Sequence, residues 1–170
     1  DLFIGKGKVN SDNVLGLGKL DGITNLRAEE AGAKLFTHIK SAGLKEAMLL
    51  IEKSKNPKAE EIAAHVANGL KLRSYDFKKY KPDASKKDEK KAPKLESLKV
   101  LTAHPANAKA AYEALDKITE GVFTARDLVN TAPNDLYPDS YAKFIKSELK
   151  PLGIDIEIFG RSKLDLNFVP

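Results

Sequence analysis

The chain has 170 residues, 42% of them hydrophobic, which is enough for one domain with a core or for one domain and part of a second. It contains no cysteine, which excludes disulfides, thiolate metal sites and a cysteine nucleophile and fits a reducing compartment. No apolar run approaches the roughly 18 residues of a membrane-spanning helix, so we expect no membrane partner. The formal net charge of +5 leaves an anionic partner open.

The first 70 residues alternate short apolar runs with helical patterns, which predicts α/β architecture. Residues 1–13 are expected to form a strand fragment and a polar turn, and residues 14–18 a short strand that ends in a glycine turn. Asn25 is the predicted N-cap of a helix that Gly43 terminates. A buried strand is expected over residues 47–51, and Asn56-Pro57 predicts the start of the next helix. The buried stripe of that helix is predicted to be Ile62, Ala63, Val66, Ala67 and Leu70.

A lysine-rich stretch follows, and it holds the whole net charge. Residues 78–94 contain three acidic residues and eight lysines, namely Lys78, Lys79, Lys81, Lys86, Lys87, Lys90, Lys91 and Lys94. The stretch has two prolines and almost no apolar residues, so a solvated loop is the favoured interpretation. The alternative is an anion-binding loop whose lysines contact phosphates, although Tyr80 is not accompanied by the aromatic array that stacks on bases.

The remaining elements are a strand, two helices and a second strand. A short strand is predicted over residues 98–101, and Pro105 opens a helical pattern of about five turns that stops before Pro133. Another helix is expected from Pro138, with Gly153 at its end and an inner face of Tyr141, Phe144, Ile145 and Leu149. Isoleucines alternate with acidic residues over 154–158, which predicts a half-buried strand.

No pattern of reactive side chains indicates catalysis. His38, His65 and His104 have no neighbours at metal-ligand spacing, so surface or partly buried histidines are expected. Gly16, Gly18 and Gly22 resemble a phosphate loop, but the third glycine comes one residue late, which favours a structural turn over a nucleotide-binding domain. A Ser-His-Asp triad is disfavoured because no Gly-x-Ser-x-Gly elbow exists. Helix dipoles and capping account for the acidic residues Glu29, Glu30, Glu60, Glu61, Asp135 and Asp139.

Two stretches resemble the leucyl aminopeptidase (cytosol aminopeptidase) family. Residues 125–138, which read ARDLVNTAPNDLYP, are similar to the family segment that joins the interdomain helix to the catalytic domain. Residues 14–19, VLGLGK, are similar to a strand and turn of its N-terminal domain. The first motif is quite specific and the second is weak alone, and the order of the elements between them also fits.

The resemblance implies the following fold: an N-terminal α/β domain with a sheet flanked by helices, a long connecting helix, then the first helix and strand of a second α/β domain. The corresponding ranges are residues 1–104, residues 105–131 and residues 132–170, the last being the beginning of the catalytic domain. In the family pattern, another strand and loop would be expected in the region from Gly5 to Val14, which is short here. The pattern also has further residues before the position of Asp1.

The resemblance further implies a cytoplasmic metalloprotease, a hydrolase that releases N-terminal residues from peptides with two divalent metal ions, manganese or zinc. Such ions make a bridging water nucleophilic and polarise the scissile carbonyl. The family's Asn-Thr-Asp-Ala-Glu-Gly-Arg metal segment is absent from this sequence, so we expect no catalytic or metal-binding residue in this chain. The chain would then serve assembly, in the family a homohexamer. The alternative function is a DNA- or other anion-binding module that acts through residues 78–94, since some bacterial members of the family also bind DNA.

Overall fold

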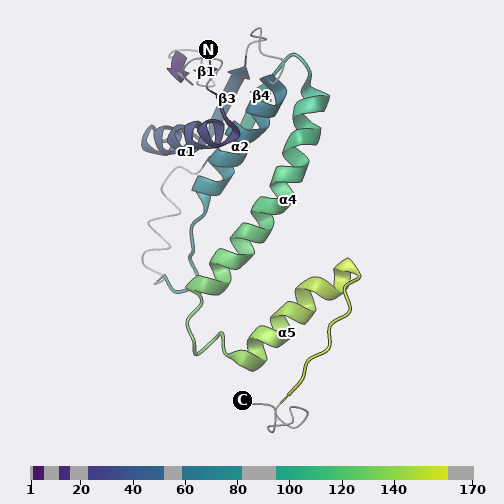
Figure 1. Ribbon diagram of the computed structural model, residues 1–170. Coiled ribbons are helices and arrows are strands. Elements are labelled where there is room, and N and C mark those ends of the chain that lie inside the picture. Colours follow the sequence, from purple (N-terminus) through teal and green to yellow (C-terminus); the bar gives the residue numbers. More distant parts are fainter. Residues whose placement is uncertain (1, 6–11, 16–22, 52–58, 82–94, 161–170) are drawn as a thin grey trace. The chain divides into compact units, whose positions relative to one another are not determined.

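The structure is a computed structural model that describes residues 2–5, 12–15, 23–51, 59–81 and 95–160. The chain divides into two compact units, residues 1–127 and residues 128–170. The first unit contains a four-stranded sheet, two helices packed on it and most of a long helix (Figure 1). The second contains one helix and a short 3-10 turn. The expected α/β class is therefore confirmed.

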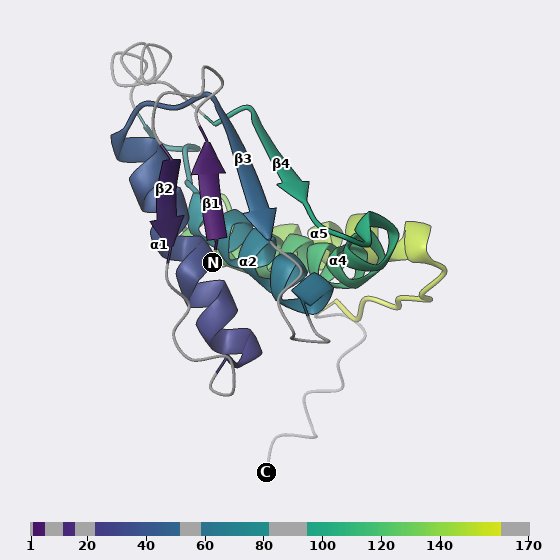
Figure 2. The ribbon, with the colours of Figure 1, turned by 90° about the horizontal axis from the view of Figure 1, so that it is seen from above.

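The sheet has the strand order β2-β1-β3-β4 and mixes antiparallel with parallel pairing (Figure 2). Strand β1 (Leu2–Gly5) pairs antiparallel with both β2 (Asp12–Leu15) and β3 (Glu46–Ile51). Strand β4 (Ser97–Leu101) pairs parallel with β3 in a register that sets Glu46 opposite Ser97. A parallel pair needs a crossover, and helix α2 (Ala59–Ser74) supplies it between β3 and β4. The strands predicted at 47–51 and 98–101 are thus confirmed. The strand predicted at 14–18 begins earlier, at Asp12, and is described only as far as Leu15.

Helix α1 (Asn25–Ser41) begins one residue earlier than the N-cap prediction placed it. Thr24 is the N-cap, because its hydroxyl accepts a hydrogen bond from the Arg27 N–H at 3.2 Å while its own backbone stays extended. Asn25 instead sits in the first turn and donates to Glu61 at 3.3 Å. The predicted end is confirmed, since Gly43 adopts the left-handed φ of 66° just after the helix. Asn56-Pro57, the predicted start of α2, lies outside the described residues.

The core lies between the sheet and the pair α1 and α2. On β3, Ala47, Leu49 and Ile51 are buried, while Met48 and Leu50 alternate with them and stay 41% and 36% exposed. The buried side chains of the helices that pack on this face are Ala28, Leu35 and Ile39 from α1 and Ile62, Ala63, Val66 and Leu70 from α2. Helices therefore flank one face of β3 in the part of the chain that the structure describes, and the stripe predicted for α2 is confirmed apart from the half-buried Ala67.

Two glycines let α1 and α2 approach until their backbones touch. A Cβ atom on Gly69 would overlap the carbonyl group of Glu29, and one on Gly32 would overlap the carbonyl oxygen of Val66. Because backbone atoms cannot swing aside as a flexible side chain does, both positions require glycine. This contact fixes how closely the two helices pack over the sheet.

Helix α4 (Pro105–Asn130) is the long helix that the sequence predicts between Pro105 and Pro133. Only Ala108 and Thr119 are buried along it, whereas Ile118 is 65% exposed. Ala111, Leu115, Val122 and Phe123 are half-buried, and the polar contacts that α4 makes beside them are described below.

The second unit holds helix α5 (Pro138–Leu149), followed by the 3-10 turn η2 (Lys150–Leu152) and by Gly153 with a φ of 78°. The helix and its glycine end are confirmed. Of its expected inner face, Phe144, Ile145 and Leu149 are half-buried and Tyr141 is exposed, and no residue of α5 is fully buried. The strand expected over 154–158 is wrong, since residues 154–160 form no regular element. A strand needs a neighbour for its backbone hydrogen bonds, and no described residue of this unit provides one.

The glycine contact predicts a specific loss of stability. Gly69→Ala should lower the free energy of unfolding by about 1–3 kcal/mol or more, because the added methyl group overlaps backbone atoms of α1. Gly121→Ala is the matched control: nothing lies within 4 Å of its added Cβ, so it should raise stability by about 0.5–1 kcal/mol through helix propensity. Urea denaturation measures both, and equal effects would contradict the contact.

Candidate functional site

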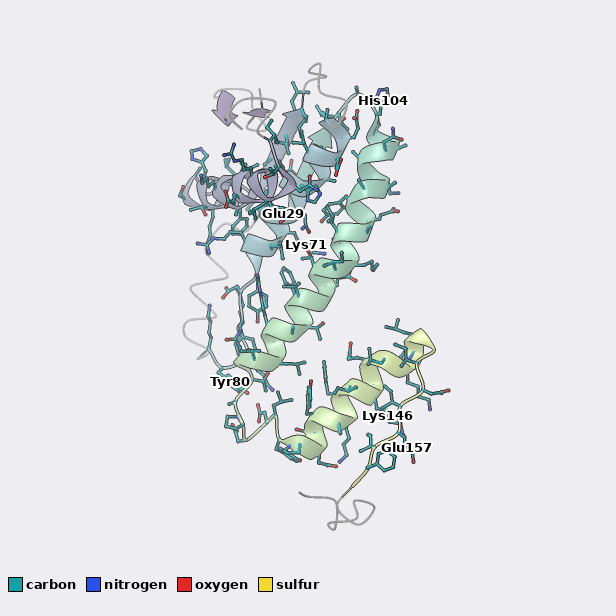
Figure 3. All side chains as sticks on the ribbon, viewed as in Figure 1. Glu29, Lys71, Tyr80, His104, Lys146 and Glu157 are labelled. Atoms are coloured by element: carbon teal, nitrogen blue, oxygen red, sulfur yellow. The ribbon has the colours of Figure 1, made fainter. Side chains whose placement is uncertain are left out.

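The first lysines of the lysine-rich stretch are held by neighbouring side chains. Lys81 Nζ lies 3.0 Å from one oxygen of Asp76, and Lys78 Nζ lies 3.5 Å from the other. The hydrogen bond from Lys81, with help from Lys78, holds the pKa of Asp76 below its ordinary value. Lys79 lies 5.4 Å from the ring centroid of Tyr80 (labelled in Figure 3). The other candidate anion-binding lysines lie outside the described residues: Lys86, Lys87, Lys90, Lys91 and Lys94.

The histidines are dispersed through the first unit. His38 and His104 are exposed, and the backbone carbonyl of His104 accepts the first hydrogen bonds of α4. Only His65 is mostly buried, with its side chain 12% exposed. The described ranges contain no group of three or more His, Asp or Glu side chains able to hold a metal ion. The described residues therefore do not fit a two-metal centre. The glycine loop at Gly16, Gly18 and Gly22 lies outside them.

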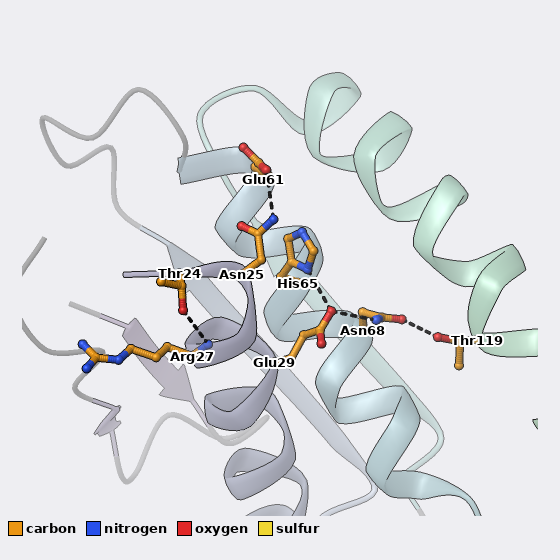
Figure 4. A network of polar contacts seen from close by, with 8 residues as sticks. All are labelled: Thr24, Asn25, Arg27, Glu29, Glu61, His65, Asn68 and Thr119. Atoms are coloured by element: carbon orange, nitrogen blue, oxygen red, sulfur yellow. Dashed lines mark hydrogen bonds and ion pairs between the residues drawn. The ribbon is translucent and has the colours of Figure 1, made fainter. Parts of the chain in front are cut away.

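A chain of polar contacts links three helices (Figure 4). Glu29 Oε1 on α1 lies 2.9 Å from His65 Nδ1 and accepts a hydrogen bond from Asn68 Nδ2 at 3.2 Å, both on α2. Asn68 Oδ1 in turn accepts a hydrogen bond from Thr119 Oγ1 on α4 at 2.6 Å. Asn68 and Thr119 are 5% and 1% exposed, so an unpaired group here would be costly. Glu29 was expected to complement a helix dipole, but it lies beyond the first turn of α1 and serves this chain of contacts instead.

A second polar contact joins α2 to α4 one helical turn away. Lys71 Nζ forms an ion pair with Asp116, whose side chain is 25% exposed. The hydrogen bond from Lys71 holds the pKa of Asp116 below its ordinary value. Burial, together with the adjacent Asp116 carboxylate, raises the pKa of Tyr112 to about 12. Tyr112 therefore remains a neutral hydrogen-bond donor to a charged carboxylate at physiological pH.

The third contact is made by residues of the ARDLVNTAPNDLYP stretch. Arg126 donates a hydrogen bond to the carbonyl of Leu72 at 2.9 Å, near the C-terminal end of α2. The guanidinium carbon also lies 5.4 Å from the ring centre of Tyr75 and 5.9 Å from that of Phe123. Tyr75 Oη donates to Asp127 at 2.8 Å. Arg126 and Asp127 thus anchor α4 to the end of α2, a role that the sequence motif alone did not reveal.

Of the other acidic residues, Glu30 also lies beyond the first turn of α1 and so does not complement the helix dipole as expected, whereas Glu60, Glu61 and Asp139 lie in first turns. Glu60 and Glu61 occupy the first turn of α2, as expected, and Glu60 accepts from Thr102 at 3.5 Å. Asp139 pairs with Lys143 at 2.6 Å within α5. At the start of α5, the backbone N–H of Tyr137 donates a hydrogen bond to Ser140 Oγ at 2.9 Å. The sequence-predicted site residues are therefore not brought together into one centre within the described part of the chain.

The Lys71–Asp116 pair predicts a pH-dependent contribution to stability. Since the folded pKa of Asp116 lies below its unfolded value, the pair stabilises above the unfolded value and the contribution is lost as pH falls through the folded pKa. Wild type should exceed Asp116→Asn in unfolding free energy at neutral pH, and the gap should close between about pH 5 and pH 2. Urea midpoints across this range measure it. Glu30→Gln, on the exposed side of α1, is the control; a gap independent of pH would contradict the assignment.

Comparison with known proteins identifies relatives along most of the chain. Residues 3–84 match the family model described as the cytosol aminopeptidase family, N-terminal domain. A probable cytosol aminopeptidase of Wolbachia pipientis is 38% identical over 89% of this chain, which covers 28% of that protein. A probable cytosol aminopeptidase of Rickettsia canadensis is 32% identical over 95% of this chain and 32% of its own length. The chain thus spans about a third of the length of these relatives.

Solved structures show the same fold. The bottromycin maturation enzyme BotP matches with a TM-score of 0.65 in its complex with Mn and 0.64 in a second structure. Sequence identity is 22% and 21%, and 91% of this chain is covered, against 31% and 32% of BotP. No helix among the described residues is long and apolar enough to cross a membrane. The chain belongs to the cytosol aminopeptidase family, and its residues 3–84 match the N-terminal domain of that family.

Proposed function

We propose that this chain is the N-terminal, non-catalytic portion of a two-metal aminopeptidase that releases N-terminal amino acids from peptides in the cytoplasm. The observation that carries the proposal is the match of residues 3–84 to the N-terminal domain of the family, together with relatives named as aminopeptidases. Because the chain covers only about 28–32% of those relatives, the activity belongs to the longer protein.

The contacts of the first unit support a structural role. Glu29, His65, Asn68 and Thr119 hydrogen-bond one another, and Lys71 is occupied by Asp116. Asn68 and Thr119 are 5% and 1% exposed, so this chain of contacts ends in buried groups that a substrate does not reach. These polar groups instead hold α4 against α2, so we assign residues 1–104 to an N-terminal domain that takes part in assembly, by family resemblance a homohexamer, and residues 105–131 to the connecting helix.

Residues 132–170 are proposed to begin the catalytic domain. In the second unit the large apolar side chains of Tyr141, Ile154 and Phe159 are 44%, 47% and 56% exposed. The rest of a catalytic domain would cover these side chains and give the segment 154–158 a strand to pair with. Anion binding by the lysine-rich stretch stays a prediction. Asp76 already pairs with Lys78 and Lys81, which weakens the case for DNA binding by this stretch.

The metal ions are proposed to bind in the catalytic domain, since the described residues here offer no group that fits them. Manganese and zinc are the two candidates. Manganese is the first to test, because BotP, which has the same fold, has been solved with Mn.

The test compares the full-length protein with the 170-residue chain. After chelation and addition of Mn²⁺ or Zn²⁺, the full-length protein should hydrolyse leucine p-nitroanilide, and the 170-residue chain should not. Light scattering should give the full-length protein the mass of a hexamer. A metal-saturated full-length protein without activity would overturn the aminopeptidase assignment, and metal-dependent hydrolysis by the 170-residue chain would overturn its non-catalytic role.

A further inference from the structure

A cleft of about 730 Å³ opens in the first unit, within the range of small-molecule sites. It runs among α2, β4, the C-terminal part of α1 and the first two turns of α4. Its walls come from the sheet–helix unit and from α4, which the polar contacts described above hold together. All the residues that line it belong to the first unit.

The interior of the cleft is lined by apolar side chains, several of them alanines. Ala63, Ala64 and Ala67 of α2 face it together with Ala108 of α4, and Leu98 and Val100 of β4 line it as well. Ala63, Ala64 and Ala108 are themselves buried, so they form the closed base of the cleft. The apolar surface that remains open to a ligand comes from half-buried side chains: Ala67, Phe36, Leu95, Leu98 and Val100. An acyl or other hydrocarbon tail would gain free energy by leaving water here.

The polar lining of the cleft is predominantly cationic. Four lysines line it, Lys40, Lys71, Lys78 and Lys109, against two carboxylates, Asp76 and Glu96. Both carboxylates are already engaged by lysines, Asp76 by Lys81 and Glu96 by Lys45 at 3.5 Å. Within the part of the chain that the structure describes, Lys40 has no ion-pair partner, and Lys109 has only an exposed pair with Glu113 at 3.7 Å. The N-terminal turn of α4 also borders the cleft and adds positive potential.

We propose that this cleft binds an amphipathic carboxylate, whose hydrocarbon tail lies on the alanine-lined floor and whose head group pairs with Lys40 or Lys109. The apolar floor disfavours a nucleic acid, which would expose phosphates without filling it. The lysine lining disfavours cationic amphiphiles, because the lysine ammonium groups would repel their positively charged head groups. The site goes beyond the proposed peptidase function and does not depend on it.

The test is isothermal titration of the 170-residue chain with decanoate below its micelle concentration, with ¹⁵N-HSQC spectra to locate the contact. Decanoate should bind at one site and shift the amides of Ala67, Leu98 and Ala108, whereas decyltrimethylammonium and butyrate should not bind measurably. Lys40→Glu should weaken decanoate binding about fivefold, because repulsion replaces an ion pair. Lys34→Glu, the same charge change on α1 away from the cleft, should leave affinity unchanged.

A cleft-filling pair of variants completes the design. Ala67→Leu should abolish decanoate binding with no loss of thermal stability, and Ala110→Leu, at an exposed position of α4 outside the cleft, should preserve binding. Circular dichroism confirms that each variant is folded. The proposal is overturned if decanoate does not bind, if it binds as well as the cationic amphiphile, or if Ala67→Leu lowers the thermal midpoint, which would mean that the chain itself fills the space.

Discussion

The structure of the first unit depends on the backbone contact between α1 and α2 at Gly32 and Gly69. Because the helices approach this closely, the Glu29 carboxylate reaches across to His65 and Asn68 on α2. Asn68 then extends the contact to Thr119 on α4. A larger side chain at either glycine would separate the helices and leave buried polar groups without partners, a penalty beyond the lost packing. The packing of helix α4 on α2 thus depends on Gly32 and Gly69, which have no side chains.

Three polar contacts along α4 add to its sparse apolar packing, in which Ala108 is the one buried apolar residue of the helix. Thr119, Asp116 and Arg126 each meet a different part of α2: a buried amide, a lysine and the carbonyl of Leu72. Directional contacts of this kind fix the rotation and register of a helix better than an apolar stripe does. Such control would suit the connecting role proposed for this helix, because a small rotation of the helix would move everything that follows it. The same spacing between α2 and α4 leaves the alanine-lined cleft open.

The elements of the first unit could be predicted from the sequence because their signals are local. Apolar runs at β3 and β4, glycine at the end of α1 and helical spacing from Pro105 were each sufficient. The partners of Glu29, Asp116 and Arg126 could not be predicted, since each contact joins residues 36 or more apart in the chain. Alternation alone also misled: residues 154–158 have the pattern of a strand, but a strand forms only beside a neighbour. The expectation of metal ions came only from the family resemblance. Among the described residues, no group of three or more His, Asp or Glu side chains could hold a metal ion.

The claim that polar contacts make α4 part of one cooperative unit with α1 and α2 is tested most directly by native-state hydrogen exchange. Amides of residues 108–124 should open with the same free energy as the cores of α1 and α2. Thr119→Val should lower the opening free energy of α4 by about 1–3 kcal/mol, because it leaves the buried Asn68 amide oxygen unpaired. Thr124→Val, which removes only an exposed bond to the carbonyl of Glu120, should change it little. An α4 that opens far more easily than α1 and α2, with the two variants alike, would contradict the account.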